Sequence, residues 1–296
     1  MVRSEQTMVA AAPELGLNDP WETLVGGFRE AGDALPEPWQ SVIGPWDIPD
    51  RGDRPYVYMN FMISRDGRVS FNEPDNFSPA PIALGKSHDP WLMGVLRARA
   101  DAVMVGDGTL KANSDHIWRS EFVLPHAADA FADLRRAENL PETVPLVLLS
   151  YDADLPEDAA QFADPAAHTI LVTTLAVADR AREFADRVPA QVDVRAFGET
   201  AVDLAAMMRM LRSEFGIRRL LCEGGPRVYA SLLAAHLVDD EFLTLSPIVL
   251  GGTATALRPS LVEGIAFGPD TAPVSHLLTV ARSGDFLFLR SRYAVS

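Results

Sequence analysis

The sequence predicts an α/β fold built on a mainly parallel β-sheet, and two observations support this prediction. Short apolar runs typical of buried strands alternate along the chain with segments in which apolar residues recur at helical spacing. Near the C-terminus, two apolar runs (277–281 and 286–293) flank Ser283-Gly284-Asp285, which predicts an antiparallel hairpin at one edge of the sheet. The 296 residues are enough for one large domain or two small ones.

The expected elements alternate between strand and helix in chain order. Asp89 is the expected N-cap of the first helix, Thr200 caps the clearest helix, Gly216 ends it, and Pro226 begins the last one. The expected strands are 56–63, 102–105, 146–149, 169–172, 192–194, 219–222 and 242–245. The expected helices are 89–100, 125–136, 175–187, the segment between Thr200 and Gly216, and the segment after Pro226.

Residues 1–52 differ from the rest because proline and glycine interrupt regular periodicity there. Only a short helix at 21–29 is expected. Three tryptophans, Trp21, Trp39 and Trp46, need an apolar surface to pack on. We therefore interpret 1–52 as an extension that lies on the main domain, residues 53–296, or on a neighbouring subunit. The alternative is a partly ordered tail.

Composition and charge exclude several classes of protein. The formal net charge of −15 disfavours nucleic acids and anionic membranes as partners. The one cysteine, Cys222, excludes a disulfide framework and sites built from several thiolates. No apolar run reaches the roughly 18 residues of a transmembrane helix, and residues 1–12 are too weakly patterned for a signal peptide. We expect a cytoplasmic protein.

Polar or glycine-rich residues directly follow four of the expected strands. Ligands of open parallel sheets bind at the carboxyl ends of the strands, so four such ends favour one shared site. The segments are Ser64-Arg65-Asp66-Gly67, Gly106-Asp107-Gly108-Thr109, Ser150 and Glu223-Gly224-Gly225-Pro226. The only two lysines, Lys86 and Lys111, are expected to flank this site together with Arg97 and Arg119.

Glu223-Gly224-Gly225-Pro226 is the strongest of these signals. Two glycines let the backbone approach a ligand closely. The helix that starts at Pro226 directs unpaired N–H groups and a partial positive charge toward the same place. The segment therefore suits a pyrophosphate, and the alternative is a tight turn that binds no ligand.

Other segments of the sequence do not match the nucleotide-binding, metal-binding or nucleophile motifs that they partly resemble. Gly106-Asp107-Gly108-Thr109 begins like a dinucleotide fingerprint, but Lys111 stands where the third glycine belongs. Residues 80–87 miss a P-loop because Ala80 replaces its first glycine. The six histidines show no metal-ligand spacing, and neither a zinc-deaminase signature nor a G-x-S-x-G elbow occurs. No metal is expected.

The strand ends resemble the reductase domain of the bifunctional deaminase/reductase of riboflavin biosynthesis, which belongs to the dihydrofolate-reductase-like superfamily. The combination of segments is specific, although no single piece is, and it covers roughly residues 53 to 293. The resembling segments are 54–57, 64–68, 96–109, 223–226, 237–241 and 246–252. The resemblance implies a mainly parallel central sheet flanked by helices, with antiparallel C-terminal strands. The deaminase half has no counterpart here.

The resemblance implies NADPH-dependent reduction of a phosphorylated pyrimidine such as 5-amino-6-(5-phosphoribosylamino)uracil, opening the ribose to a ribityl chain, in a homodimer. Glu223 would be the catalytic residue, accepting hydrogen bonds from sugar hydroxyls or assisting proton transfer. The substrate residues it implies are Ser64, Asp66, Arg97, Ile117 and Arg119. The cofactor residues it implies are Ile63, Gly106, Gly108, Thr109, Asn113, Ser150, Gly224, Gly225, Pro226, Arg227 and Val228.

Individual roles follow from side-chain chemistry. Arg97 offers a planar fork for the substrate phosphate, and Arg119 is the nearest basic residue to the family's second phosphate contact. Asp66 is expected to shape a turn. Asn113 stands where the family usually has an acid. Two acids, 152 and 154, follow Ser150, where they would repel a 2′-phosphate, so NADH or another hydride donor remains an alternative.

Two other functions remain open from the sequence. One is a dihydrofolate-type, pterin-type or other small-molecule reductase on the same fold. The other is a non-catalytic dinucleotide-binding module that serves a protein partner.

Overall fold

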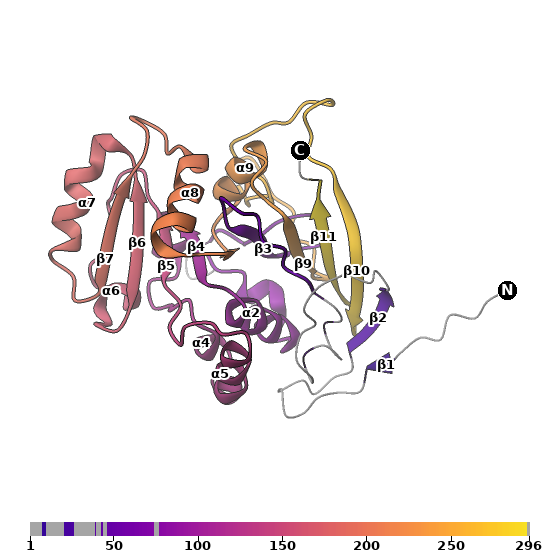
Figure 1. Cartoon of the computed structure of the whole chain (residues 1–296). Coiled ribbons are helices and arrows are strands. Elements are labelled where there is room, and N and C mark those ends of the chain that lie inside the picture. Colours follow the sequence, from indigo (N-terminus) through magenta and orange to yellow (C-terminus); the bar gives the residue numbers. More distant parts are fainter. Residues whose placement is uncertain are drawn as a thin grey trace.

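A computed structural model of the chain describes residues 8–9, 21–26, 39, 43, 46–73 and 77–294. An eleven-stranded sheet runs through these residues in the order β1-β2-β10-β11-β9-β3-β8-β4-β5-β6-β7 (Figure 1). The seven strands from β9 to β7 are parallel to one another, whereas β1, β2, β10 and β11 pair antiparallel. The predicted fold class is therefore confirmed.

The strands and helices have the following bounds. The strands are β1 (Met8–Val9), β2 (Trp21–Val25), β3 (Tyr56–Ile63), β4 (Ala102–Gly106), β5 (Leu146–Leu149), β6 (His168–Thr173), β7 (Gln191–Ala196), β8 (Arg219–Cys222), β9 (Asp240–Leu245), β10 (Ser275–Ser283) and β11 (Phe286–Tyr293). The helices are α2 (His88–Ala98), α3 (Asp107–Ala112), α4 (Ser120–Val123), α5 (Ala128–Ala137), α6 (Ala160–Ala163), α7 (Ala178–Ala185), α8 (Leu204–Phe215) and α9 (Pro226–Ala234), with 3₁₀ turns at Ala80–Ala83, Pro125–Ala127 and Leu175–Val177.

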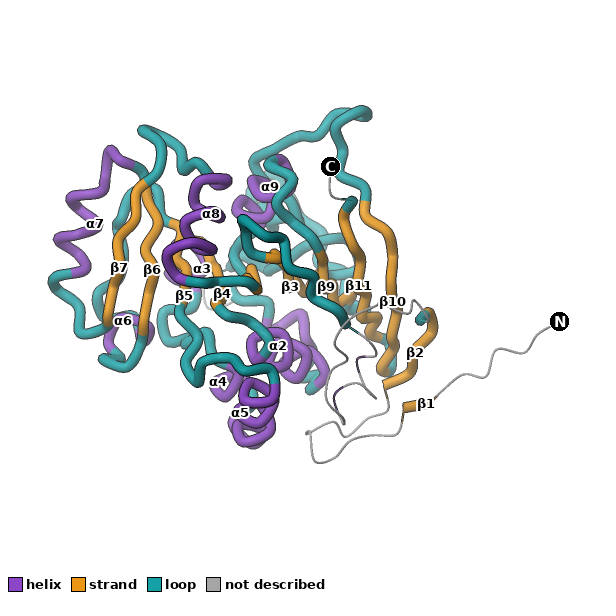
Figure 2. The backbone as a smooth tube through the Cα atoms, in the orientation of Figure 1, coloured by secondary structure: helices purple, strands orange, loops and turns teal. Residues whose placement is uncertain are grey.

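Helices cover both faces of the sheet, as the tube in Figure 2 shows. Trp91 of α2 and Phe131 of α5 belong to the core cluster on one face. Met207 of α8 and Tyr229 of α9 belong to the cluster on the other. Because both faces are covered, the central strands are continuous apolar runs, as expected for a parallel sheet.

The expected helix at 21–29 is wrong where the chain is described, because Trp21–Val25 forms the strand β2. β2 pairs antiparallel with β10 and adds a strand to the sheet. Its Trp21 ring stacks on Phe288 of β11, with ring centroids 4.6 Å apart. Residues 27–29 lie outside the described residues. Pairing with a preformed edge overrides the weak local preference for a helix.

Two predicted helix caps are also wrong. Asp203, not Thr200, caps α8, since its side chain accepts a hydrogen bond of 2.9 Å from the Ala206 amide. Asp89 is the second residue of α2, after Ser87 at the N-cap position, and its side chain is buried. Near each helix start, more than one residue is of a type that caps helices. Only the position at which the helix begins decides which of them is the cap.

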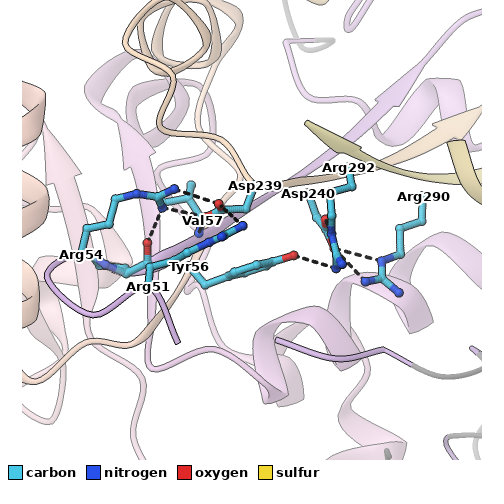
Figure 3. A network of polar contacts seen from close by, with 9 residues as sticks. Arg51, Arg54, Tyr56, Val57, Asp239, Asp240, Arg290 and Arg292 are labelled. Atoms are coloured by element: carbon cyan, nitrogen blue, oxygen red, sulfur yellow. Dashed lines mark hydrogen bonds and ion pairs between the residues drawn. The ribbon is translucent and has the colours of Figure 1, made fainter. Parts of the chain in front are cut away.

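Buried carboxylates join the chain before β3 to the sheet (Figure 3). The Asp239 carboxylate accepts hydrogen bonds from both Nη atoms of Arg54, at 2.7 and 2.8 Å, and forms an ion pair with Arg51 at 2.8 Å. The same carboxylate accepts a hydrogen bond from the Val57 amide at 2.8 Å. Asp239 is fully buried, so these bonds replace the water that its charge would otherwise require.

The next residue of the chain repeats this arrangement on β11. Asp240, also fully buried, accepts hydrogen bonds from Arg290 at 2.8 Å and Arg292 at 2.7 Å. Arg292 also donates to the Tyr56 hydroxyl at 2.9 Å. The network therefore fixes β9 between β3 and β11, the point where parallel pairing changes to antiparallel (Figure 3).

Replacing Asp239 with Asn should destabilise the protein strongly. The change leaves two arginines without their buried counter-charge, a loss of about 3–5 kcal/mol for a broken buried pair. Chemical denaturation followed by far-UV circular dichroism measures it. Asp270→Asn on an exposed loop is the matched control and should leave the midpoint unchanged; equal midpoints for both variants would contradict this assignment.

Asp89→Asn should stabilise the protein at neutral pH. Burial raises the pKa of Asp89 to about 6, and the nearby charge of Glu223 raises it further. Because the folded pKa exceeds the unfolded value, the contribution of Asp89 to stability is fully present below about pH 4 and is lost as pH rises through about 6. Chemical denaturation at pH 4 to 8 measures the free energy of unfolding. The variant should exceed wild type by an amount that approaches about 3 kcal/mol at pH 8 and is absent at pH 4.

Candidate active site

The four polar strand ends predicted from the sequence belong to four adjacent strands. β3, β8, β4 and β5 are neighbours in this order and are parallel. Their carboxyl ends therefore lie along one edge of the sheet. This edge carries the segments that begin at Ser64, Glu223, Asp107 and Ser150, so the four ends lie along one edge of the sheet.

The segment after β8 lies directly on the end of β4. A Cβ atom on Gly224 would stand 2.4 Å from Cα of Val105 and 2.6 Å from N of Gly106, so only glycine fits at position 224. The Glu223 amide donates to the Met104 carbonyl at 2.9 Å. The backbone of β4 thus sets the position of Glu223.

The start of α9 meets β4 and α3 at the same place. Gly225, with φ of +38°, precedes Pro226, and a Cβ on it would lie 3.3 Å from Oγ1 of Thr109. A Cβ on Gly106 would lie 2.9 Å from Val228. A side chain at Gly108 would meet nothing within 4 Å.

The first turns of α9 and α3 bear on the binding of a dinucleotide. The first amides of α9 lack partners inside the helix, and the helix dipole places partial positive charge on them. The open space at Gly108 leaves the first turn of α3 approachable. This combination of amides and exposed backbone fits a pyrophosphate.

Arg97 and Glu223 form a buried ion pair. Nη2 of Arg97 lies 2.6 Å from Oε2 of Glu223, and Nε lies 3.1 and 3.2 Å from the two carboxylate oxygens. Their side chains are only 2% and 7% exposed. The fork predicted to hold a phosphate therefore holds a carboxylate in this structure.

The remaining Arg97 contacts come from the chain between α3 and α4. Nη1 donates to the Arg119 carbonyl at 3.1 Å, and Nη2 lies 2.9 Å from Nε2 of His116. Burial lowers the pKa of His116 to about 3, and the charge of Arg97 lowers it further. A neutral imidazole with its proton on Nδ1 can accept this hydrogen bond from Arg97.

The sequence did not identify His116. It is a lone histidine without metal-ligand spacing, so its type and position carry no signal. Its ring packs edge-on against Trp118 and Phe122, with centroids 5.0 and 4.6 Å away. These two aromatic neighbours are visible in the sequence, but their contact with the histidine depends on the turn between α3 and α4.

Arg119 meets Arg97 through its carbonyl only, and the other expected substrate residues are not among the hydrogen-bond partners of Arg97. Nη2 of Arg119 contacts Asp164 at 3.2 Å. Ser64 donates to Asp66 at 2.7 Å, and Asp66 accepts the amides of residues 250 and 251 at 2.9 and 2.8 Å. The Leu250 amide is the main cause that lowers the pKa of Asp66 to about 2. Asp66 thus binds a turn and a loop together. Ile117 is half-buried, and its carbonyl accepts from the Arg119 amide at 2.8 Å.

A second polar cluster surrounds Ser150 after β5. Its hydroxyl lies 2.9 Å from Oδ2 of Asp107 and 3.3 Å from Oδ1 of Asp152. Lys111 Nζ lies 3.8 and 3.9 Å from these two carboxylates. The Asp154 carboxylate pairs with Arg180 at 2.8 Å. The acids that follow Ser150 therefore have basic partners.

The remaining expected residues divide between this edge and other places. Ile63 is buried at the end of β3, Arg227 is exposed in the first turn of α9, and the Asn113 side chain donates to the Thr109 carbonyl at 2.9 Å. Lys86 lies farther along this edge, because its Nζ is by Gly284 in the turn between β10 and β11, next to the carboxyl end of β9. In the described residues, no group of three His, Cys, Asp or Glu is placed to hold a metal ion. No described helix is long and apolar enough to cross a bilayer.

Comparisons with known proteins agree with this geometry. The RibD C-terminal domain family matches residues 55–268. The 2,5-diamino-6-ribosylamino-4(3H)-pyrimidinone 5′-phosphate reductase of Archaeoglobus fulgidus is 31% identical over 217 residues, 72% of this chain and 89% of that relative.

Two solved structures share the fold at lower identity. A pyrimidine reductase-like protein from Corynebacterium diphtheriae has a TM-score of 0.66 and 19% identity, covering 87% of this chain and 98% of its own. The diaminohydroxyphosphoribosylaminopyrimidine deaminase/5-amino-6-(5-phosphoribosylamino)uracil reductase of Thermotoga maritima has a TM-score of 0.57 and 16% identity, covering 82% and 57%. On the match of family and relative, this chain belongs to the RibD C-terminal domain family.

Proposed function

We propose that the protein is an NADPH-dependent reductase of the riboflavin-biosynthesis type that converts the ribosyl group of a phosphoribosylamino-pyrimidine to a ribityl chain. The single observation that carries this proposal is the Arg97–Glu223 pair. It places a carboxylate beside the start of α9, in a chain 31% identical to a named reductase of this class.

The bound dinucleotide would supply a hydride to C1′ of the ribose. The bond between C1′ and the ring oxygen would break, the ring oxygen would take a proton, and the ring would open to the ribityl chain, with NADP⁺ as the other product. The protein would orient the two reactants, because hydride chemistry belongs to the cofactor. Glu223 would accept hydrogen bonds from sugar hydroxyls or assist the proton transfer to the ring oxygen.

Residues around α9, α3 and β5 would hold the dinucleotide. The amides at the start of α9 would face the pyrophosphate, with Thr109 and Gly108 beside it. We propose NADPH as the donor because the acids after Ser150 are paired: Asp154 with Arg180, and Asp152 with Lys111. We further propose that the enzyme is a cytoplasmic homodimer.

Purified protein should oxidise NADPH when given the 5′-phosphate of either the diaminopyrimidinone or the aminouracil substrate. Absorbance at the nicotinamide band follows the reaction, and NADH in parallel tests the choice of donor. Oxidation only with dihydrofolate would favour the pterin-type alternative. Tight dinucleotide binding without turnover on any substrate would favour a non-catalytic binding module.

Glu223→Gln should retain dinucleotide affinity and lose turnover. The amide has nearly the shape of the carboxylate but neither its charge nor its proton affinity, so kcat should fall by about a hundredfold or more. Stopped-flow oxidation and a fluorescence titration of NADPH separate the two effects. Because the variant also breaks the pair with Arg97, its melting temperature must be measured alongside; unchanged turnover would remove Glu223 from the site.

A further inference from the structure

A buried polar cluster lies against the first turn of α9 and has no part in the function proposed so far. It consists of Tyr229 of α9, Glu241 of β9 and Tyr293 of β11, which we call the Tyr–Glu–Tyr cluster. The Tyr229 hydroxyl donates to Oε2 of Glu241 and lies 2.8 Å from the Tyr293 hydroxyl, which is 3.4 Å from the same carboxylate oxygen. Tyr229 is fully buried, and Glu241 is 8% exposed.

The number of protons in the cluster sets the direction of its hydrogen bonds. Each hydroxyl carries one proton. Because Tyr229 gives its proton to Glu241, the shorter bond leaves Tyr293 to donate to the Tyr229 oxygen. The chain of donors therefore runs from Tyr293 through Tyr229 to Glu241. Tyr229 is its central member and ties α9 to two strands at once.

The surroundings of the cluster are apolar. Tyr229 belongs to the core cluster on the α9 face, and its ring packs on Phe61 with centroids 5.2 Å apart. Burial raises the pKa of Glu241, and no basic side chain among the described residues forms an ion pair with it. Polar groups in such a place add little to stability compared with apolar packing, but a satisfied network rigidifies the elements that it joins. The cluster is therefore better suited to holding α9 in place than to stabilising the core.

The part of α9 that the cluster holds is the turn proposed to bind the pyrophosphate. The Tyr229 amide donates to the Gly225 carbonyl at 3.1 Å, so this residue closes the first turn. Val228, in the same turn, contacts the end of β4, where a Cβ on Gly106 would lie 2.9 Å from it. β9 and β11 lie on the other side of β8 from β4. The turn is thus held from both sides, by apolar contact at β4 and by hydrogen bonds at β9 and β11.

Resting on the proposed function, we propose that Tyr229 is a positioning residue which, with Glu241 and Tyr293, fixes the first turn of α9 and thereby sets the affinity of the enzyme for its dinucleotide. Hydrogen bonds from backbone amides weaken steeply as their distance and angle depart from the optimum. A first turn that is free to shift would therefore bind a pyrophosphate less tightly. The chemistry at C1′ would be unaffected once the dinucleotide is bound.

Tyr229→Phe provides the sharpest test, because it removes one oxygen atom and keeps the ring that packs on Phe61. The Kd of NADPH should rise by about tenfold, as expected for the loss of a buried hydrogen bond that orients the site. The kcat at saturating NADPH should stay within about twofold of wild type. Fluorescence titration and steady-state kinetics measure the two quantities.

Tyr56→Phe is the matched control. It removes a buried hydroxyl on the opposite face of the sheet, which accepts a hydrogen bond of 2.9 Å from Arg292. This variant should lower the melting temperature and leave the Kd of NADPH unchanged. A Kd that Tyr229→Phe does not alter, or that both variants raise equally, would overturn the proposal.

Substitutions of Glu241 test whether the cluster acts as a unit. Glu241→Gln keeps an acceptor for the Tyr229 hydroxyl and should hold the Kd within about twofold of wild type, whereas Glu241→Leu removes the acceptor and should raise it by about tenfold. The double variant Tyr229→Phe/Glu241→Leu should also lose about tenfold, because both changes break the same hydrogen bond. Effects that multiply to about a hundredfold would contradict the shared role.

Amide hydrogen exchange of the ligand-free protein separates this inference from the proposed function. Tyr229→Phe should accelerate exchange in residues 226–234, and Tyr56→Phe should not. Unchanged exchange in these residues refutes the positioning role. An enzyme that reduces neither phosphate, yet binds NADPH more weakly as Tyr229→Phe, refutes the proposed reaction and keeps the positioning role; a wild type that binds no dinucleotide refutes both.

Discussion

The arrangement of the candidate site depends on the buried ion pair between Arg97 and Glu223. Arg97 comes from the last turn of α2, and Glu223 follows β8, so the pair joins the helix layer to the carboxyl edge of the sheet. A buried pair is stable only when both partners are present and their remaining hydrogen-bonding groups are satisfied. His116 and the Arg119 carbonyl provide these remaining bonds, which also attaches the segment between α3 and α4 to the site.

Much of this site could be predicted from the sequence because it rests on local patterns. Apolar strands followed at once by polar or glycine residues indicate strand ends, and parallel pairing brings such ends to one edge. The two glycines were expected to let a ligand approach the backbone, whereas at Gly224 the close approach is made by backbone atoms of β4. Pro226 begins α9 as its lack of an N–H predicts.

The remaining features depend on contacts between distant segments. Arg97 has the right type for a phosphate fork, but a sequence does not show that a carboxylate 126 residues later occupies it. Asp89 fits a helix cap by type, and only packing of α2 on the sheet buries it. Trp21 lies in a strand because β10 offers an edge to pair with, which no local pattern near residue 21 encodes.

In this strongly acidic protein, several basic side chains near the candidate site are already paired with acids. Arg97 is paired with Glu223, Arg119 with Asp164, and Lys111 lies between two carboxylates. Positive charge at the start of α9 comes from Arg227, exposed in its first turn, together with the backbone amides and the helix dipole.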